Sequence, residues 1–348
     1  MKPGGTPRDN GAMQVFRGIH HPGLAPACAL TIGNFDGVHR GHQAMLALLR
    51  SEAEHRGLPS CVMTFEPRPC DHFARLAGRP EQAPARIASL RDKLDELRRC
   101  GIDQVVVLRF DAALAAQPPQ SFIEEMLVRG LGARHVLVGD DFRFGARRAG
   151  DYAMLDAAGA QLGFDVGRMN SYQVHGVRVS SSAVRAALAA GDMPRAHELL
   201  GRTHSVSGHV VHGRKLGRSL GFPTLNVRFA HATSAAQGIF AVRTHGLGPR
   251  PLDGVASLGV RPTVEHGGRL MLEVHCFDWP AELGVDGGYG KLVRVELLHK
   301  LRDEARYDGL EALTTAIRED TLQARAYLAS ATITDHAALG RQTTRDRI

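Results

Sequence analysis

Cysteines and long apolar runs are both scarce in this chain of 348 residues. The five cysteines are scattered and no CxxC pair occurs, so the sequence predicts reduced thiols and no disulfide framework. No run approaches the ~18 apolar residues of a transmembrane helix. The Gly- and Pro-rich start, MKPGGTPRDNGAM, shows no apolar core of a signal peptide. We therefore expect a cytoplasmic protein that does not bind a membrane.

Lysine and aromatic residues are scarce as well. Only five lysines occur, so arginine carries nearly all of the positive charge behind the net +7. Guanidinium groups suit phosphate, yet a solvated basic surface explains the same balance. Aromatic residues that can stack on bases make up only 5%, so we expect no nucleic-acid partner. A hydrophobic content of 43% supports real cores, and the length suggests two domains.

The first half alternates between apolar β-type runs and helical patterns. The expected strands are 28–33, 60–65, 103–110, 134–139 and about 164–169. The expected helices are 42–56, about 84–99, 120–129 and about 151–160. This order predicts a Rossmann-like parallel sheet with helices on both faces. Ligands of such sheets bind at the carboxyl ends of the strands.

The pattern changes near residue 193. Short β-type runs separated by Gly- and Pro-rich turns predict a small antiparallel barrel, and the pattern of 309–328 predicts a closing helix. The expected fold class is therefore α/β plus all-β. The expected parts are a disordered tail (1–14), a first domain (15–192), a linker helix (193–201), a second domain (202–332) and a tail (333–348).

The first strand leads into the loop GNFDGVHRGH, which carries His39 and His42 before a helix. A helix N-terminus attracts phosphate through its N–H groups and its dipole. Glycines let the backbone approach closely, and two imidazoles three residues apart can donate to phosphate oxygens. A metal pair is the competing interpretation, but it needs further ligands, and none is found nearby.

Three more polar clusters follow expected strands. TFEPRP offers Phe65 for stacking on a planar ligand, and VGDDFRFG places Asp140 and Asp141 at the carboxyl end of its strand. VRVSSSAVR precedes a helix; its serines either cap that helix or form a phosphate clamp with Arg178 and Arg185. Four such clusters at strand ends are hard to explain as independent surface loops.

The second half contains GRKLGRSLGFPTLN but no Walker-type P-loop. Its glycines either form hairpin turns or, with Lys215 and Arg218, cover a nucleotide. Thr224 and Asn226 are two apart on a strand and share a face, where both can contact magnesium or phosphate. Glu273 lies in an apolar strand, where a carboxylate is costly without a partner or a role.

Together these motifs resemble the bacterial bifunctional riboflavin kinase/FMN adenylyltransferase (FAD synthetase) family. The resemblance covers roughly residues 15–330 and rests also on GVASLGVRPTV, LEVHCFD and YGKLVRVELLHKLRDE. This sequence departs from the family pattern with Arg68 for His, Ser182 for Thr, Leu225 for Ala, Val260 for Thr and His204 for Tyr.

The resemblance implies a set of site residues. For adenylyl transfer it implies ATP binding by Gly33, Asn34, Asp36, His39, His42, Ser181, Ser182 and Arg185. It implies a flavin side made of Phe65, Asp141 and Arg178. For the kinase it implies ATP and magnesium binding by Gly213, Lys215, Gly217, Arg218, Gly221, Thr224 and Asn226, with Thr224 and Asn226 as the metal ligands. The implied catalytic residues are His39, His42 and Glu273, with Glu273 as general base for the ribityl 5′-hydroxyl.

The expected function follows from this resemblance. The barrel phosphorylates riboflavin with ATP to give FMN, and the first domain transfers AMP from a second ATP to FMN, giving FAD and pyrophosphate. Magnesium serves both sites, and the enzyme is a monomer or a weak homo-oligomer. Two alternatives stay open: another HxGH nucleotidyltransferase of the cytidylyltransferase type, and a non-enzymatic regulator that binds flavin or nucleic acid.

Overall fold

The computed structural model describes residues 12–174, 176–213, 220–229, 233–261, 269–284 and 286–345. The chain forms two compact units. One consists of Met1–Pro84 and Leu90–Ser180, and the other of Ala85–Ser89 and Ser181–Ile348. The expected domain boundary after residue 192 therefore lies later than the division before Ser181.

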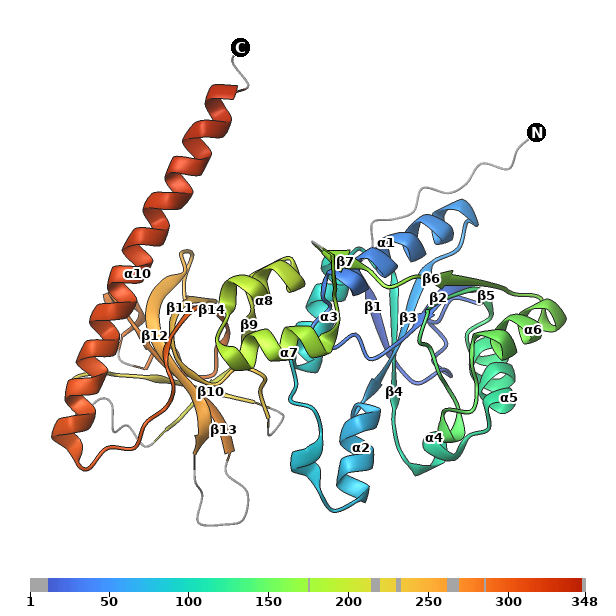
Figure 1. Cartoon of the computed structure of the whole chain (residues 1–348), viewed down its shortest axis with the longest axis horizontal. Helices are drawn as coiled ribbons and strands as arrows, with labels where there is room; N and C mark the ends of the chain where they lie inside the picture. The colour runs from blue at the N-terminus through green and yellow to red at the C-terminus, as the bar shows by residue number, and fades with distance from the viewer. Residues whose placement is uncertain are drawn as a thin grey trace. The chain divides into compact units, whose positions relative to one another are not determined.

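The first unit contains a six-stranded parallel sheet in the order β1-β4-β3-β2-β5-β6 (Figure 1). The strands are β1 (Gln14–Arg17), β2 (Cys28–Ile32), β3 (Ser60–Glu66), β4 (Gln104–Arg109), β5 (Ala133–Gly139) and β6 (Asp165–Met169). From β2 the sheet extends one way through β3 and β4 and the other way through β5 and β6. The carboxyl ends of β2 and β5 therefore flank the position where ligands bind in doubly wound sheets.

Helices cover both faces of this sheet. They are α1 (Arg40–His55), α2 (Pro69–Leu76), α3 (Leu90–Arg99), α4 (Ala112–Ala116), α5 (Pro119–Ser121), the π-helix η2 (Phe122–Gly130) and α6 (Tyr152–Leu162), with the short 3₁₀ turns η1 (Pro80–Gln82) and η3 (Ala146–Arg148). Strand alternation creates two cores. Leu30 packs on the side of η2 and α6, whereas Ala29 packs on the side of α1 and α3. A small hairpin, β7 (Gln173–Val174) and β8 (Val177–Arg178), precedes the second unit.

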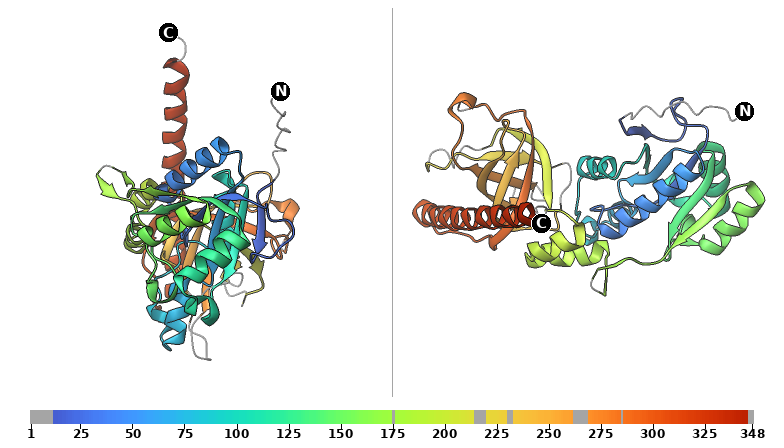
Figure 2. Two further views of the ribbon diagram at one scale, coloured as in Figure 1. Left: turned by 90° about the vertical axis from the view of Figure 1, so that its right-hand side faces the viewer. Right: turned by 90° about the horizontal axis from the view of Figure 1, so that it is seen from above.

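The second unit is a closed antiparallel barrel in the order β10-β13-β12-β11-β14-β9 (Figure 2). Its strands are β9 (Ser205–Val211), β10 (Leu225–Arg228), β11 (Gly238–His245), β12 (Leu252–Arg261), β13 (Arg269–Cys276) and β14 (Leu292–Arg302). Its helices are α7 (Ser181–Ala190), α8 (Met193–Leu200), the 3₁₀ turn η4 (Ala281–Leu283) and α10 (Leu310–Arg345). Helix α10 closes the barrel by burying Ala324 and Leu328 against Ile239, Ala241 and Val255.

The expected fold class, a parallel sheet followed by an antiparallel barrel with a closing helix, is confirmed. Some details differ. The sheet has an unexpected strand β1 that begins at Gln14, inside the expected tail, and α2 was not expected at all. The closing helix continues past residue 328 to Arg345. None of the helices within the described ranges has the length and apolar content that crossing a bilayer requires.

Candidate active sites

The loop between β2 and α1 adopts an unusual backbone conformation. Phe35, Gly37 and Val38 have φ values of 46°, 83° and 40°. Left-handed conformations cost non-glycine residues roughly 1–3 kcal/mol each, and they persist only where the surroundings hold them. Both side chains are buried, Phe35 at 1% exposure and Val38 at 0%. Packing therefore holds this loop at the carboxyl end of β2, beside the crossover between β2 and β5.

His39 is the N-cap of α1. Its side chain accepts a hydrogen bond from the backbone N–H of His42, with 3.3 Å from Nδ1 to N. Because Nδ1 accepts, the neutral ring carries its proton on Nε2, which makes Nε2 the donor. The two imidazoles stack with centroids 3.6 Å apart. The first turn of α1 contains no acidic residue, so its dipole stays available to an anion.

Asp36 in the same loop is buried and ion-paired. Its Oδ2 accepts from Nη1 of Arg68 at 2.7 Å, and both side chains are 3% exposed or less. Arg68 also donates to both carboxylate oxygens of Asp71 and, at 2.6 Å, to the carbonyl of Pro84. Burial alone would lower the pKa of Arg68, but the bond with Asp71 and the charge of Asp36 raise it above its ordinary value. Removing one partner of such a pair costs about 3–5 kcal/mol.

Phe65 lies in an aromatic cluster that sequence reasoning missed. Its ring meets Phe110 edge to face with centroids 5.8 Å apart, and Phe110 in turn contacts His72 and Phe73. Phe73 is 50% exposed. Phe65 and Phe110 stand at the carboxyl ends of β3 and β4, so this cluster offers an aromatic surface to a planar ligand. The sequence signal for this cluster was the pair His72 and Phe73, which follows TFEPRP by three and four residues.

Asp141 and Arg178, both expected on the flavin side, lie together. Nη2 of Arg178 is 3.1 Å from Oδ2 of Asp141 and 3.7 Å from Oδ1 of Asp140. The Ser171 hydroxyl donates to Asp140 at 2.7 Å and is the main cause of a lowered pKa for that carboxyl. The hairpin before α7 is thus joined to the carboxyl end of β5.

Ser181, Ser182 and Arg185 stand at the start of α7, which belongs to the second unit. Nε of Arg185 donates to the carbonyl of Ala85 at 2.8 Å. Binding of ATP by Ser181, Ser182 and Arg185 is not tested by these contacts and stays a prediction.

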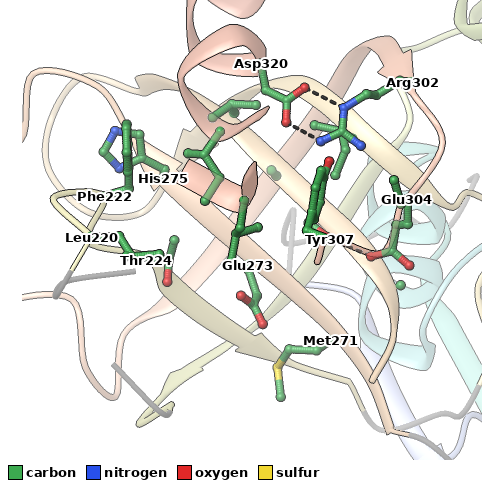
Figure 3. A pocket seen from close by; sticks show the side chains of 18 of the residues that line it. Leu220, Phe222, Thr224, Met271, Glu273, His275, Arg302, Glu304, Tyr307 and Asp320 are labelled. Atoms are coloured by element: carbon green, nitrogen blue, oxygen red, sulfur yellow. Dashed lines mark hydrogen bonds and ion pairs between the residues drawn. The ribbon is translucent and has the colours of Figure 1, made fainter. Parts of the chain in front are cut away.

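The barrel contains a pocket of about 310 Å³, and three neighbouring strands bring polar residues to it (Figure 3). Asn226 on β10 lies directly opposite Glu273 on β13, and Glu273 lies directly opposite Ser257 on β12. Directly opposed residues share a face of the sheet, and all three line the pocket. In Figure 3 the Glu273 carboxylate and the Thr224 hydroxyl face its open centre.

The strand phase around Thr224 follows the expected alternation. Thr224 and Asn226 line the pocket, whereas Leu225 lies close enough to Gly288 that a Cβ there would come within 2.8 Å of Cδ2. Leu225, which stands where the family pattern has Ala, therefore faces away from the pocket. Val260 is 44% exposed and His204 is buried at 4%.

The wall of the pocket near α10 holds residues that sequence reasoning missed. Arg302 donates to both carboxylate oxygens of Asp320, at 2.7 and 2.6 Å. Glu304 accepts from the Ser257 hydroxyl at 2.8 Å, and the Tyr307 ring lies 5.8 Å from the Arg302 guanidinium. The charged segment LRDEARYD begins in the last two residues of β14 and carries Arg302, Glu304 and Tyr307, which was the signal in the sequence.

The glycine-rich segment lies partly outside the described residues, and Lys215, Gly217 and Arg218 belong to that part. Gly213 approaches Asn226 so closely that an added Cβ would meet its side-chain amide. Asn226 is only 5% exposed. Gly221 has a φ of 84°, and an added Cβ there would meet nothing within 4 Å. Glycine is therefore needed at 221 for its left-handed backbone conformation and not for close packing.

The oxygen donors of the barrel pocket fit a hard cation. Thr224, Asn226 and Glu273 offer a hydroxyl, an amide oxygen and a carboxylate, the donor types that Mg²⁺ takes together with substrate phosphates. Within the ranges that the structure describes, no group of three His, Cys, Asp or Glu residues is placed to hold a metal ion. The pair His39 and His42 therefore has no third ligand of these types there.

Comparisons with known proteins match both units. The FAD synthetase family model matches residues 22–183, and the riboflavin kinase family model matches residues 200–328. The bifunctional riboflavin kinase/FMN adenylyltransferase of Escherichia coli (strain K12) is 47% identical over 317 residues, which are 90% of this chain and 98% of that protein. The protein of the same name from Pseudomonas fluorescens is 44% identical over 91% of this chain and 98% of its own length. A solved structure named a macrolide-efflux protein, from Streptococcus pneumoniae, is similar in fold, with a TM-score of 0.70, 25% identity, and coverage of 89% of this chain and 97% of that one.

Proposed function

The chain belongs to the bifunctional riboflavin kinase/FMN adenylyltransferase family, and we propose that the barrel and the parallel-sheet unit each carry one of its two activities. The enzyme phosphorylates riboflavin with ATP to give FMN. It then transfers AMP from ATP to FMN, giving FAD and pyrophosphate.

For the kinase step, the alignment of Asn226, Glu273 and Ser257 across three strands carries the proposal. Glu273 accepts the proton of the ribityl 5′-hydroxyl as its oxygen attacks the γ-phosphorus of ATP. The bond between the γ-phosphorus and the β,γ-bridging oxygen breaks, and ADP leaves. Thr224 and Asn226 would hold Mg²⁺, which neutralises charge on the phosphates when bound.

For adenylyl transfer, an FMN phosphate oxygen attacks the α-phosphorus of ATP and pyrophosphate leaves. His39 at the N-cap and the stacked His42 donate to phosphate oxygens as negative charge develops there. The aromatic cluster around Phe65 receives the isoalloxazine ring. No covalent intermediate on the protein is needed, because the attacking oxygen belongs to the substrate.

Two substitutions separate the activities. Glu273→Gln keeps the side-chain shape and removes its basicity, so FMN formation should fall by about 10²–10⁴-fold while supplied FMN is still converted to FAD. His42→Ala should lower FAD formation by about 10²-fold or more and spare riboflavin phosphorylation. Riboflavin and FMN are supplied in separate reactions with Mg-ATP, and the products are resolved by chromatography. If Glu273→Gln lost both conversions while folded, a single shared site would be the better account.

We also propose a cellular location, an oligomeric state and a set of partners for the enzyme. We place it in the cytosol, since all five cysteines are free thiols. We propose a monomer or weak homo-oligomer that acts without nucleic acid or membrane. Many arginines are already paired with carboxylates, such as Arg56 with Asp165 and Arg243 with Asp253, which leaves less positive charge for a polyanion.

A further inference from the structure

Arg68 is the largest of the fully buried side chains in the described residues. Its guanidinium reaches three partners at once, at distances of 2.6–3.1 Å: the carboxylates of Asp36 and Asp71 and the carbonyl of Pro84. The planar fork of arginine can serve several acceptors in fixed directions, which an ammonium or an imidazole cannot do to the same extent. The partners belong to three separate segments of the chain.

One end of this contact fixes the loop between β2 and α1 (residues 33–39), here called the nucleotide loop. Asp36 lies between Phe35 and Val38, the two non-glycine residues of the loop with left-handed backbone. Such a backbone needs surroundings that hold it in place. The bond from Arg68 supplies a polar contact at the centre of the loop, three residues before the N-cap His39.

The other end fixes the start of α2 (residues 69–73), here called the flavin segment. Asp71 lies in the first turn of α2, and the two residues that follow it, His72 and Phe73, belong to the aromatic cluster. Arg68 binds both oxygens of the Asp71 carboxylate. A shift of Arg68 would therefore move this helix and the nucleotide loop relative to each other.

We propose that Arg68 is a positioning residue for adenylyl transfer, which joins the nucleotide loop to the flavin segment so that both substrates are held in one geometry. Asp36 then acts through Arg68 and does not touch the nucleotide. This proposal rests on the adenylyl-transfer activity proposed for the first unit.

The test measures steady-state kinetics of FMN-to-FAD conversion in the full-length protein. Arg68→Gln should lower kcat/KM for ATP and for FMN together, by ten- to a hundredfold, because displacements near 1 Å cost about that much. Arg68→Lys keeps the charge but not the planar fork, so its kcat/KM values should lie between those of the wild type and Arg68→Gln. Riboflavin phosphorylation should stay within twofold. Arg75→Gln, the same change at an exposed position of α2, should leave both activities unchanged.

A double-mutant cycle with Asp36→Asn distinguishes positioning from direct binding. If Asp36 acts through Arg68, Asp36→Asn should cost at least tenfold in the wild-type background and less than threefold in the Arg68→Gln background. Additive losses would show that Asp36 touches substrate by itself and would overturn the proposal.

Controls of folding and activity complete the design. Circular dichroism and thermal melting report folding, and a lowered melting temperature with unchanged KM and kcat would mean that Arg68 is only structural. If Arg68→Gln does not fold, Arg68→Lys and Arg68→His carry the same test, and values within twofold of wild type in both would refute it. Absence of FAD synthesis in the wild-type protein would instead refute the proposed function.

Discussion

Replacing Gly213 by alanine should slow riboflavin phosphorylation about a hundredfold and spare adenylyl transfer. The new Cβ would lie 2.5 Å from Cγ and 2.6 Å from Oδ1 of Asn226, whereas carbon contacts are optimal at about 3.5–4.0 Å. Asn226 is 5% exposed, so its amide has little room to turn away. The two segments must therefore separate by about 1 Å, or the amide must leave its place opposite Glu273.

The size of the effect follows from that displacement. A shift of about 1 Å at a reacting centre costs on the order of 10²-fold in rate. Forcing a methyl group into a filled site costs about 1–3 kcal/mol of unfolding free energy. For a unit of this size, each kcal/mol lowers the melting temperature by about 2–4 °C. The rate of riboflavin phosphorylation should thus fall about a hundredfold while the protein is still folded.

The assay compares Gly213→Ala with Gly248→Ala, because a Cβ at exposed Gly248 meets nothing within 4 Å. FMN formation is followed by chromatography, and FAD formation from supplied FMN is the internal control. In the Asn226→Ala background the stability cost of Gly213→Ala should disappear, since the crowded amide is gone. Wild-type kinase rates in Gly213→Ala, or an equal stability cost in both backgrounds, would contradict this prediction.

The remaining predictions concern strand phase and pH. Asn226→Ala should weaken use of Mg-ATP by the kinase, seen as a raised KM for ATP, whereas Leu225→Ala on the opposite face should be tolerated; the reverse result would mean that the strand phase is wrong. Burial, and then the charge of Arg56, lower the pKa of His135 below its ordinary value of 6.5. The unfolded chain then binds more protons, so the free energy of unfolding should fall as pH drops from about 6.5 toward the lower folded pKa. Urea denaturation of His135→Leu should show a shallower fall, and an unchanged pH dependence would contradict this assignment.

Elements with strong local signals could be predicted from the sequence. The runs at 28–33 and 134–139 became β2 and β5 within one residue, because continuous apolar β-branched stretches bounded by glycine belong to sheets covered on both faces. Strand β1 has four residues, of which one is buried, so it gives almost no periodic signal. Helix α2 begins at Pro69 and has only eight residues, so about two turns were available for a periodic pattern.

Contacts between distant segments could not be predicted in this way. The Arg68–Asp36 pair joins residues 32 positions apart, and its formation depends on how β2 and β3 lie side by side. The alignment of Glu273 with Asn226 depends on barrel register, which local propensity does not determine. The resemblance suggested that both residues serve one site, but only the register indicates how they meet.

Strand β1 has a consequence for the solution behaviour of the protein. In the order β1-β4-β3-β2-β5-β6, it lies at an edge of the sheet and covers β4, whose sequence QVVVLR is among the most β-prone in the chain. Without β1, the backbone of β4 would become an open template for pairing with another chain. A four-residue strand with exposed Gln14 and Arg17 is a poor template itself, because edges that are short and polar discourage such pairing. Strand β1 therefore protects the edge of β4 from pairing with other chains. Truncation of the chain beyond residue 13 would remove this protection and should promote aggregation.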